Sequence, residues 1–212
     1  RLGEVDVVAP ASPQSAAAHG ITVLGPIGTR TVHVGDQFVG TAVEGRPADC
    51  VKIALSGLLP HKPDLVVSGI NDGANVAINV LYSGTVAAAA EGALLGVRSV
   101  AVSLERGEDM DFDRAARIAR ELIEQMLKAD SDRGLPIIHH RGAGWLVNLN
   151  IPAFRTDVPR GLRIVRQSTQ AMEDNYTRHE GPDGRNYYFL DGDFTDTHQS
   201  DTDLEALREG YI

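Results

Sequence analysis

Residues 64–104 read DLVVSGINDGANVAINVLYSGTVAAAAEGALLGVRSVAVSL, and this segment carries the clearest signals of the chain's architecture. It begins at 64–68 with an apolar run rich in β-branched residues, which predicts a buried strand. A loop rich in glycine and asparagine follows. Residues 83–85, Ser-Gly-Thr, then open an alanine-rich helix that stops at Gly96. A further apolar run at 98–104 predicts another strand. The order strand, helix, strand indicates two parallel strands. The helix carries the chain back to the end of the sheet where the first strand began, so the second strand runs in the same direction.

The flanking sequence extends this pattern in both directions. Downstream we expect an amphipathic helix over 111–129, whose buried face is marked by Phe112, Ala115, Ala119, Leu122 and Met126, and then a strand at 145–151. Upstream we expect a short buried strand at 5–9, a loop to residue 20, a strand meander over 21–43 outside the main sheet, and a helix from Pro47 that ends before Pro60. The fold class is therefore α/β, with a Rossmann-like, mostly parallel sheet that carries helices on both faces.

The chain changes character after Pro152. Charge and turn residues become more frequent, and candidate strands appear at 162–167 and 186–190. We divide the chain into a catalytic core at 1–152 and a β-rich extension at 153–212, an oligomerisation arm that reaches a partner subunit. Because the chain begins without methionine and ends on what reads as the start of a strand, we expect sequence to be missing at both ends, including the first strand of the core.

Composition restricts the classes of function. The chain has 212 residues, 42% hydrophobic and 23% charged, as in an ordinary globular protein. Its formal charge of −9 argues against binding to duplex nucleic acid or to an anionic membrane, because both need a basic surface. Cys50 is the only cysteine, and we interpret it as a small buried residue in a reducing compartment. No signal peptide or membrane-spanning run is visible, so the cytoplasm is the expected location.

Three features fall at the carboxyl ends of the predicted strands, where open α/β sheets bind ligands. Ser15 follows the first visible strand, Asn71 follows the strand at 64–68, and residues 83–85 begin the next helix. Asn71 and, more weakly, Ser15 offer neutral oxygens that suit a hard cation such as Mg²⁺ or Mn²⁺. Ser83, Gly84 and Thr85 offer hydroxyls and the amino end of a helix to a phosphate.

Each of these features also has a purely structural reading. Ser-Gly-Thr before a helix is typical of ordinary capping, and an asparagine in a loop that contains glycine is typical of turn geometry. Ser15 alone carries no signal, and His19 is equally compatible with a site and with a plain loop. His139 and His140 are expected to be polar surface residues. No single motif therefore decides the function.

Together, however, the motifs resemble those of the SurE family, the survival protein E nucleotidases. The resemblance covers nearly the whole chain, and the runs at 68–75 and 82–92 are its most specific part. The other matching pieces, in chain order, are Val8-Ala9-Pro10, Ser15, the run at 45–51, the run at 101–104, the run at 148–152, Thr202-Asp203 and Glu209-Gly210-Tyr211.

The resemblance implies a metal-dependent phosphatase that hydrolyses nucleoside 5′- and 3′-monophosphates and, as in some members, short polyphosphate. It implies one divalent cation per subunit, Mg²⁺ or Mn²⁺, and assembly into a homodimer or homotetramer. Ser15 and Asn71 match the family's serine and asparagine metal ligands. The family's pair of aspartates belongs to an Asn-Asp-Asp-Gly motif that chain order places before Arg1, so the catalytic residues are expected there.

Further substrate contacts are expected from Asn75, and the segment 45–49 is a second candidate for shaping the pocket. Two other classes of function stay open. The chain could be a nucleotide-binding module without catalysis, or an assembly module built on a Rossmann-like core. The preferred nucleotide and the nucleophile are not readable from the residues.

Overall fold

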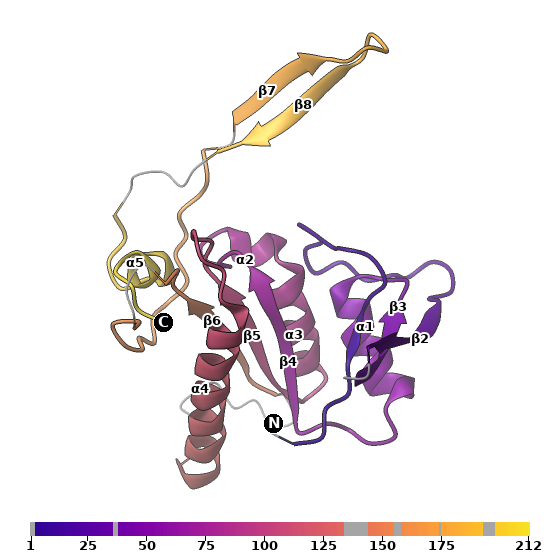
Figure 1. The fold of residues 1–212 in the computed structure, drawn as a ribbon, viewed down its shortest axis with the longest axis vertical. Helices are drawn as coiled ribbons and strands as arrows, with labels where there is room; N and C mark the ends of the chain where they lie inside the picture. Colours follow the sequence, from indigo (N-terminus) through magenta and orange to yellow (C-terminus); the bar gives the residue numbers. More distant parts are fainter. Residues whose placement is uncertain (1–2, 36–37, 134–143, 155–157, 174, 193–197) are drawn as a thin grey trace.

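The protein is described by a computed structural model that covers residues 3–35, 38–133, 144–154, 158–173, 175–192 and 198–212, without side chains at 130–133. Figure 1 shows the arrangement of its elements. In chain order these are β1 (Val8–Pro10), β2 (Thr29–Val34), β3 (Phe38–Val43), α1 (Pro47–Ile53) with a π-helical turn at Ala54–Leu58, β4 (Leu65–Asp72), α2 (Asn79–Tyr82), α3 (Gly84–Leu94), β5 (Arg98–Leu104), α4 (Phe112–Arg133), β6 (Leu146–Ile151), β7 (Asn175–Glu180), β8 (Asn186–Asp191) and α5 (Asp203–Arg208).

The main sheet has the order β4-β5-β6, and all of its strands are parallel. Successive side chains of β5 point to opposite faces, as the geometry of a strand requires. Val100 and Val102 pack with Ala115, Ala119 and Ile123 of α4, whereas Ala101 packs with Val86 and Ala89 of α3. The predicted α/β sheet with helices on both faces is therefore confirmed.

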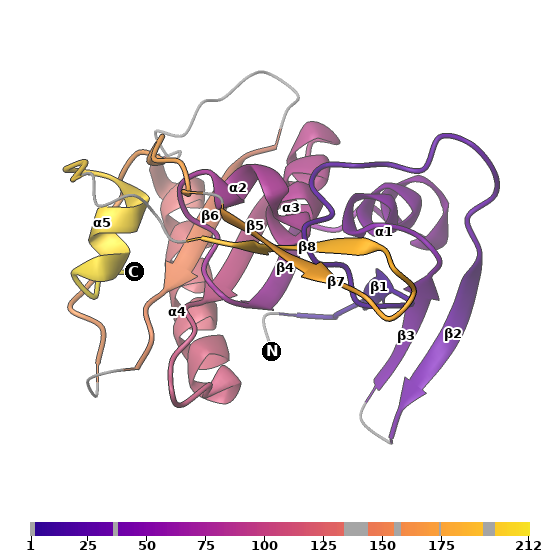
Figure 2. The ribbon, with the colours of Figure 1, turned by 90° about the horizontal axis from the view of Figure 1, so that it is seen from above.

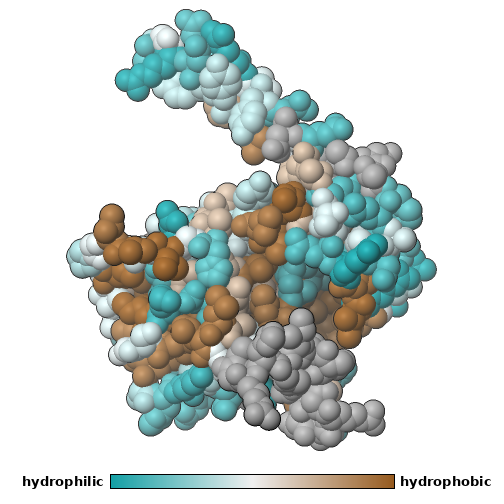
Figure 3. Space-filling view, turned by 180° about the vertical axis from the view of Figure 1, so that it is seen from behind, coloured by the Kyte–Doolittle hydropathy of each residue, from teal (hydrophilic) through white to brown (hydrophobic). Residues whose placement is uncertain are grey.

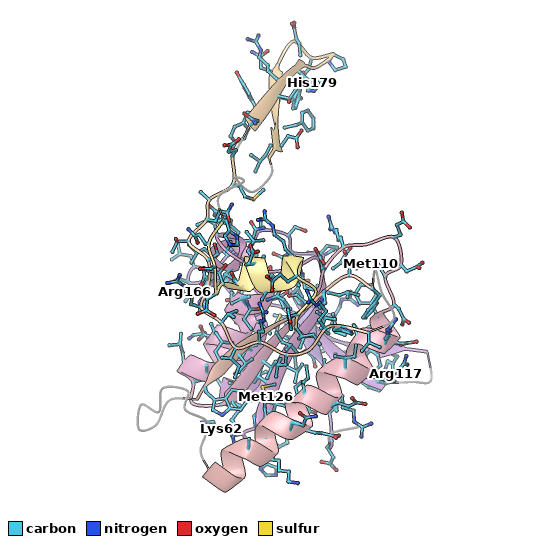
Figure 4. All side chains as sticks on the ribbon, turned by 90° about the vertical axis from the view of Figure 1, so that its left-hand side faces the viewer. Lys62, Met110, Arg117, Met126, Arg166 and His179 are labelled. Carbon is cyan, nitrogen blue, oxygen red and sulfur yellow. The ribbon has the colours of Figure 1, made fainter. Side chains whose placement is uncertain are left out.

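Helix α4 confirms the predicted amphipathic helix and extends it to Arg133. Figure 4 looks onto this helix, whose Met126 is partly buried and packs against the core cluster while Arg117 is exposed. One residue of the predicted buried face is wrong. Phe112, the first residue of the helix, is 39% exposed and is not part of the cluster between α4 and the sheet, where Met110 packs instead.

A second sheet with the order β1-β3-β2 lies outside the main sheet, as the predicted meander requires. The strand expected at 5–9 is displaced: β1 runs from Val8 to Pro10, and Val5 is 67% exposed. It is also only partly buried, because its three residues pair with β3 alone among the described strands. The predicted strand was thus wrong both in its bounds and in its depth of burial.

Strand β4 contains an irregularity next to Asn71. Its pairing with β5 shifts register between Ser68 and Asn71. Gly69 has a φ of +131°, and a Cβ at this position would lie 2.3 Å from the carbonyl oxygen of Val102. Only glycine fits here, because the shift brings the two backbones too close for any side chain. This register shift determines which way the side chains of Asn71 and Asp72, the last residues of β4, point.

The extension differs most from expectation. The candidate strand at 186–190 is confirmed as β8, and β7 pairs with it in an antiparallel ribbon that projects from the body. The candidate strand at 162–167 is wrong, since only Arg166 forms an isolated bridge there. Residues 211–212 do not form a strand either; the chain ends against Gly161 and Arg163 through backbone hydrogen bonds. Helix α5 was not predicted.

Among the described residues, no helix combines the length and the apolar character needed to cross a membrane.

Candidate functional site

A cavity of about 680 Å³ opens at the carboxyl ends of the main strands. Figure 2 looks down onto this end of the sheet. All six residues predicted for metal, phosphate or substrate line it: Ser15, Asn71, Asn75, Ser83, Gly84 and Thr85. They come from three segments, the loop after β1, the end of β4 with its following loop, and the start of α3. The topology thus brings together residues that are separated by up to 70 positions.

Asn71 is held in one orientation. Its side-chain nitrogen Nδ2 donates a hydrogen bond to the carbonyl oxygen of Gly73 at 2.7 Å. The hydroxyl of Thr85 donates to Oδ1 of Asn71 at 3.3 Å, a long contact. Since the nitrogen is engaged with the backbone, the carbonyl oxygen is the atom directed toward the start of α3. This oxygen retains a lone pair for a cation or a bound water.

The start of α3 combines capping with free backbone donors. Ser83 is the N-cap, and its hydroxyl oxygen accepts a hydrogen bond from the backbone N–H of Val86 at 3.1 Å. The capping interpretation is therefore correct, although the Ser83 hydroxyl can still donate its own proton. The backbone N–H groups of Gly84 and Thr85 lie in the first turn, where no preceding carbonyl of the helix can accept them. Capping and anion binding can therefore coexist at this helix end.

Gly84 also has a packing role that the sequence did not indicate. A Cβ at this position would lie 2.8 Å from Cγ of Pro47, the first residue of α1. Gly84 is buried, so its small size lets α1 and α3 approach each other. Close approach of a ligand need not be the reason for this glycine.

Asn75 shapes the cavity from within a buried network. It is 6% exposed, and its Nδ2 donates to the hydroxyl of Ser103 at 2.7 Å. Its backbone N–H donates to Oδ1 of Asn150 at 2.8 Å, while its carbonyl oxygen accepts from the side chains of Asn148 and Asn150. Oδ1 of Asn148 is buried with no hydrogen-bond partner among the described residues. These bonds fix the loop after β4 to the ends of β5 and β6.

The sequence did not predict that the extension closes one side of the cavity. Leu204, Leu207 and Arg208 of α5 line it. Asp203 holds this helix in place, because its carboxylate accepts hydrogen bonds from the backbone N–H groups of Ala77 at 3.0 Å, Ser168 at 2.7 Å and Leu204 at 2.8 Å. A local signal for the helix did exist, since Thr202 and Glu205 have the spacing of a capping box.

Charged side chains at the rim of the cavity are partly neutralised. Nε of Arg106 lies 2.9 Å from Oδ1 of Asp72, and both side chains are mostly exposed. Glu105 accepts a hydrogen bond from the backbone N–H of Ala153 at 2.9 Å. The side chain of Arg208 makes no hydrogen bond or ion pair with the described part of the chain, so its positive charge is available to a ligand.

The described residues fit a hard cation only in part. Asn71 Oδ1 and Ser15 Oγ are neutral oxygens of the kind that Mg²⁺ and Mn²⁺ accept. No group of three or more His, Cys, Asp or Glu side chains with a suitable arrangement occurs in the described ranges. A divalent ion at this place would therefore need further carboxylate ligands.

The segment 45–49, the second candidate for shaping the pocket, does not line the cavity. Asp49 instead accepts hydrogen bonds from the backbone and hydroxyl of Thr22, both at 2.7 Å, and from the backbone of Arg46 at 2.9 Å. Burial alone raises the pKa of the Asp49 carboxyl, but the hydrogen bonds from Thr22 and Arg46 outweigh it and hold the pKa below its ordinary value. The segment's role is to fix the loop before β2.

Cys50 is buried, as predicted. Burial, together with the negative charge of Asp49, raises the pKa of the Cys50 thiol to about 11. The thiol is therefore protonated at neutral pH, which agrees with its interpretation as a small buried residue. His139 and His140 lie outside the described residues.

His19 is not a cavity residue but is engaged behind it. Its Nε2 lies 2.9 Å from Oε2 of Glu91, a residue of α3 whose side chain is 7% exposed, and Nζ of Lys52 lies 2.7 Å from the other oxygen. Burial raises the pKa of Glu91, but hydrogen bonds from Lys52 and His19 outweigh this effect and lower the pKa overall. Glu91 is therefore ionised and joins the loop after β1 to α1 and α3.

Comparison with known proteins gives a consistent result. The model of a family described as "Survival protein SurE" matches residues 1–174. A protein of Rhodopirellula baltica named 5′-nucleotidase SurE is 45% identical over 213 residues, covering all of this chain and 80% of that protein. A protein of the same name from Moorella thermoacetica is also 45% identical and is covered to 78%. The crystal structure of the SurE protein from Aquifex aeolicus superimposes with a TM-score of 0.77 at 32% identity, over 99% of this chain and 80% of that one.

Proposed function

Since this chain belongs to the SurE family, we propose that it is a nucleotidase, a phosphatase that depends on a divalent metal and hydrolyses nucleoside 5′- and 3′-monophosphates. Short polyphosphate is a further proposed substrate. The relatives named 5′-nucleotidase SurE support the reaction. One structural observation carries the proposal for this chain: the amide oxygen of Asn71, an atom type that suits a hard cation, and the amino end of α3 share a single cavity.

We assign phosphate binding and metal binding to different ends of the cavity. The N–H groups of Gly84 and Thr85, with the Ser83 hydroxyl, would bind the phosphate oxygens at the positive end of the α3 dipole. These donors are held by the helix, so they need not reorganise as negative charge develops on the phosphate. Asn71 and Ser15 would hold the metal. When bound, a divalent cation polarises the phosphate and lowers the pKa of a bound water.

The remaining ligands are proposed to be the aspartate pair that the family resemblance places before Arg1. Asn71 is the penultimate residue of β4, and the edge of β4 that faces away from β5 is not paired with any strand among the described residues. A strand at that edge would end beside Asn71. This arrangement supports a completed metal site there but does not identify the nucleophile.

We also propose that the extension serves assembly into a homodimer or homotetramer. The β7–β8 ribbon projects from the body and exposes Tyr176, Tyr187, Tyr188, Phe189 and Leu190. An isolated two-stranded ribbon is only marginally stable in water, so contact with a partner subunit would stabilise it. Figure 3 shows further apolar surface on the side of the second sheet, where Val23, Leu24 and Val39 are exposed. Light scattering measures the subunit number, and a monomer at micromolar concentration would contradict this proposal.

A cytoplasmic location is proposed as well, for which the single, buried cysteine is the support. Fractionation of cells that express the full-length protein tests it, and recovery outside the cytoplasm would contradict it.

The proposed activity is tested by phosphate release from nucleoside monophosphates in the full-length protein, with Mg²⁺ or Mn²⁺ and after chelation. We expect activity that chelation abolishes and that added metal restores. Asn71→Ala should weaken metal affinity by at least the roughly 10- to 100-fold that loss of an outer-shell partner typically causes. The control is Gln125→Ala, which removes an exposed amide side chain on α4 that does not line the cavity. Turnover that does not need metal, or no turnover at all, contradicts the proposal.

A further inference from the structure

The loop that carries Ser15 to the cavity has a strained backbone. Ala16 and Ala18 both have a φ of +50°, in the left-handed region that alanine rarely adopts. Such conformations persist only where surrounding contacts impose them. The position of Ser15 therefore depends on the contacts that hold residues 11–22.

Contacts hold this loop at both ends and behind its strained part. The backbone N–H of Ala11 donates to Val43, and that of Ala18 donates to the carbonyl oxygen of Tyr82 at 3.0 Å. Thr22 is bound to Asp49. Among the side-chain hydrogen bonds described between this loop and other elements, the one nearest to Ser15 in sequence is that of His19, whose Nε2 lies 2.9 Å from Oε2 of Glu91.

The partner of His19 makes this anchor specific to the site. Glu91 belongs to α3, the helix whose first residues form the phosphate end of the cavity. It lies six residues after Thr85, which corresponds to a rise of about 9 Å along the helix. The His19–Glu91 contact therefore links the Ser15 loop to the same rigid element that carries Ser83, Gly84 and Thr85.

We propose that His19 is a positioning residue for the proposed phosphatase reaction. It sets the position of Ser15 relative to the start of α3 by binding Glu91, without lining the cavity itself. The inference rests on the proposed function, because Ser15 has a role in catalysis only if a metal or phosphate binds there. The inference adds a residue, His19, that affects the reaction only by fixing the conformation of the loop that carries Ser15.

Lys52 provides a matched control. It binds the other oxygen of Glu91, but it belongs to α1 and makes no contact with the Ser15 loop among the described hydrogen bonds. Removing either His19 or Lys52 leaves Glu91 with one partner. If Glu91 serves only to stabilise the fold, both changes should therefore have the same consequence for activity.

The experiment compares His19→Ala, His19→Gln and Lys52→Met with the unmodified full-length protein. Three quantities are measured: Mn²⁺ affinity by calorimetry, kcat/KM for a nucleoside monophosphate, and hydrogen exchange of the amides at 11–20. We expect His19→Ala to lower Mn²⁺ affinity and kcat/KM by about 10- to 100-fold, the range typical of outer-shell partners, and to speed exchange in the loop. His19→Gln keeps an N–H donor and should recover most of the loss. Lys52→Met should leave loop exchange and Mn²⁺ affinity unchanged.

Equal losses in His19→Ala and Lys52→Met would overturn the inference, and so would faster loop exchange with unchanged Mn²⁺ affinity and kcat/KM. Failure of the proposed function has a different signature. An unmodified protein that binds Mn²⁺ but hydrolyses no nucleotide contradicts the phosphatase proposal, and the Mn²⁺ affinities of the variants then decide the role of His19. If His19→Ala does not fold, His19→Leu, which keeps the side-chain volume but lacks an N–H donor, takes its place in the comparison with Lys52→Met.

Discussion

Replacing Asp203 by asparagine should loosen the wall that α5 forms. The carboxylate accepts three backbone hydrogen bonds, two at Oδ1 from Ser168 and Leu204 and one at Oδ2 from Ala77. An asparagine that keeps its oxygen in the Oδ1 position turns an NH₂ group toward the N–H of Ala77. The substitution therefore weakens two hydrogen bonds and abolishes the third, with almost no change in side-chain volume.

The size of the effect follows from these contacts. A hydrogen bond to a charged group contributes about 1.5–3 kcal/mol and a neutral one about 0.5–1.5 kcal/mol, so the two retained bonds lose about 2 kcal/mol together. Leaving the buried N–H of Ala77 unpaired adds about 1–3 kcal/mol. Because Asp203 is only half-buried, we expect the free energy of unfolding to fall by about 3 kcal/mol. For a domain of this size, that corresponds to a fall in Tm of roughly 6–12 °C.

Urea unfolding measures the free energy of unfolding, and the KM for a nucleotide measures whether α5 keeps its position beside the cavity. Leu204, Leu207 and Arg208 belong to the same short helix, so a displaced α5 should raise KM by roughly 5-fold, the equivalent of about 1 kcal/mol. Asp109→Asn is the control, an exposed aspartate with the same change of charge. Equal stability of the two variants would refute the hydrogen-bond argument. A loss of stability with unchanged KM would refute the role of α5 in substrate binding.

Two further predictions concern the start of α3 and the response to acid. Ser83→Ala removes the N-cap and should destabilise the protein by about 1 kcal/mol. Ser83→Asp should restore stability but not phosphate affinity, since the carboxylate would repel the bound anion. Thermal unfolding with and without inorganic phosphate separates the effect on stability from the effect on phosphate binding. Asp49 and Glu91 have lowered pKa values in the folded state, so the stability they contribute is complete above the ordinary carboxyl range of about pH 4 and is lost as pH falls through their folded pKa values. Asp49→Asn should therefore flatten the dependence of Tm on pH between about 5 and 2. An unchanged slope would contradict this account.

The main sheet and its binding end were predictable because their signals are local. The apolar run at 98–104 became β5, and the Ser83 cap and Gly96 bounded α3 almost to the residue. The meeting of Asn71 with residues 83–85 followed from one topological rule, that ligands bind at the carboxyl ends of parallel strands. No long-range information was needed for this part of the site.

The rest of the site depends on contacts between distant segments. The Thr202–Glu205 spacing could have indicated α5, but nothing near it in sequence says that Leu207 faces the loop after β4. That placement comes from Asp203 binding Ala77, a contact that spans 126 positions. Likewise, the packing of Gly84 against Pro47 has no local signal, because the requirement for a small residue arises only when α1 and α3 meet.

The distribution of carboxylates explains how an acidic chain can offer a site for an anion. Asp49, Glu91 and Asp203 each hold a segment near the cavity, yet none of them lines it. Each is compensated by backbone N–H groups or cations behind the wall, so their charges stabilise the loops without repelling a phosphate at the start of α3. Of the carboxylates that do line the cavity, Asp72 is paired with Arg106. The phosphate end consequently presents hydroxyls, amides and the positive end of a helix, although the chain carries a formal charge of −9. A carboxylate introduced at Thr85 should therefore weaken phosphate binding more than the same change at an exposed residue of α4, because only Thr85 lines the cavity at its phosphate end, where the two negative charges would repel each other.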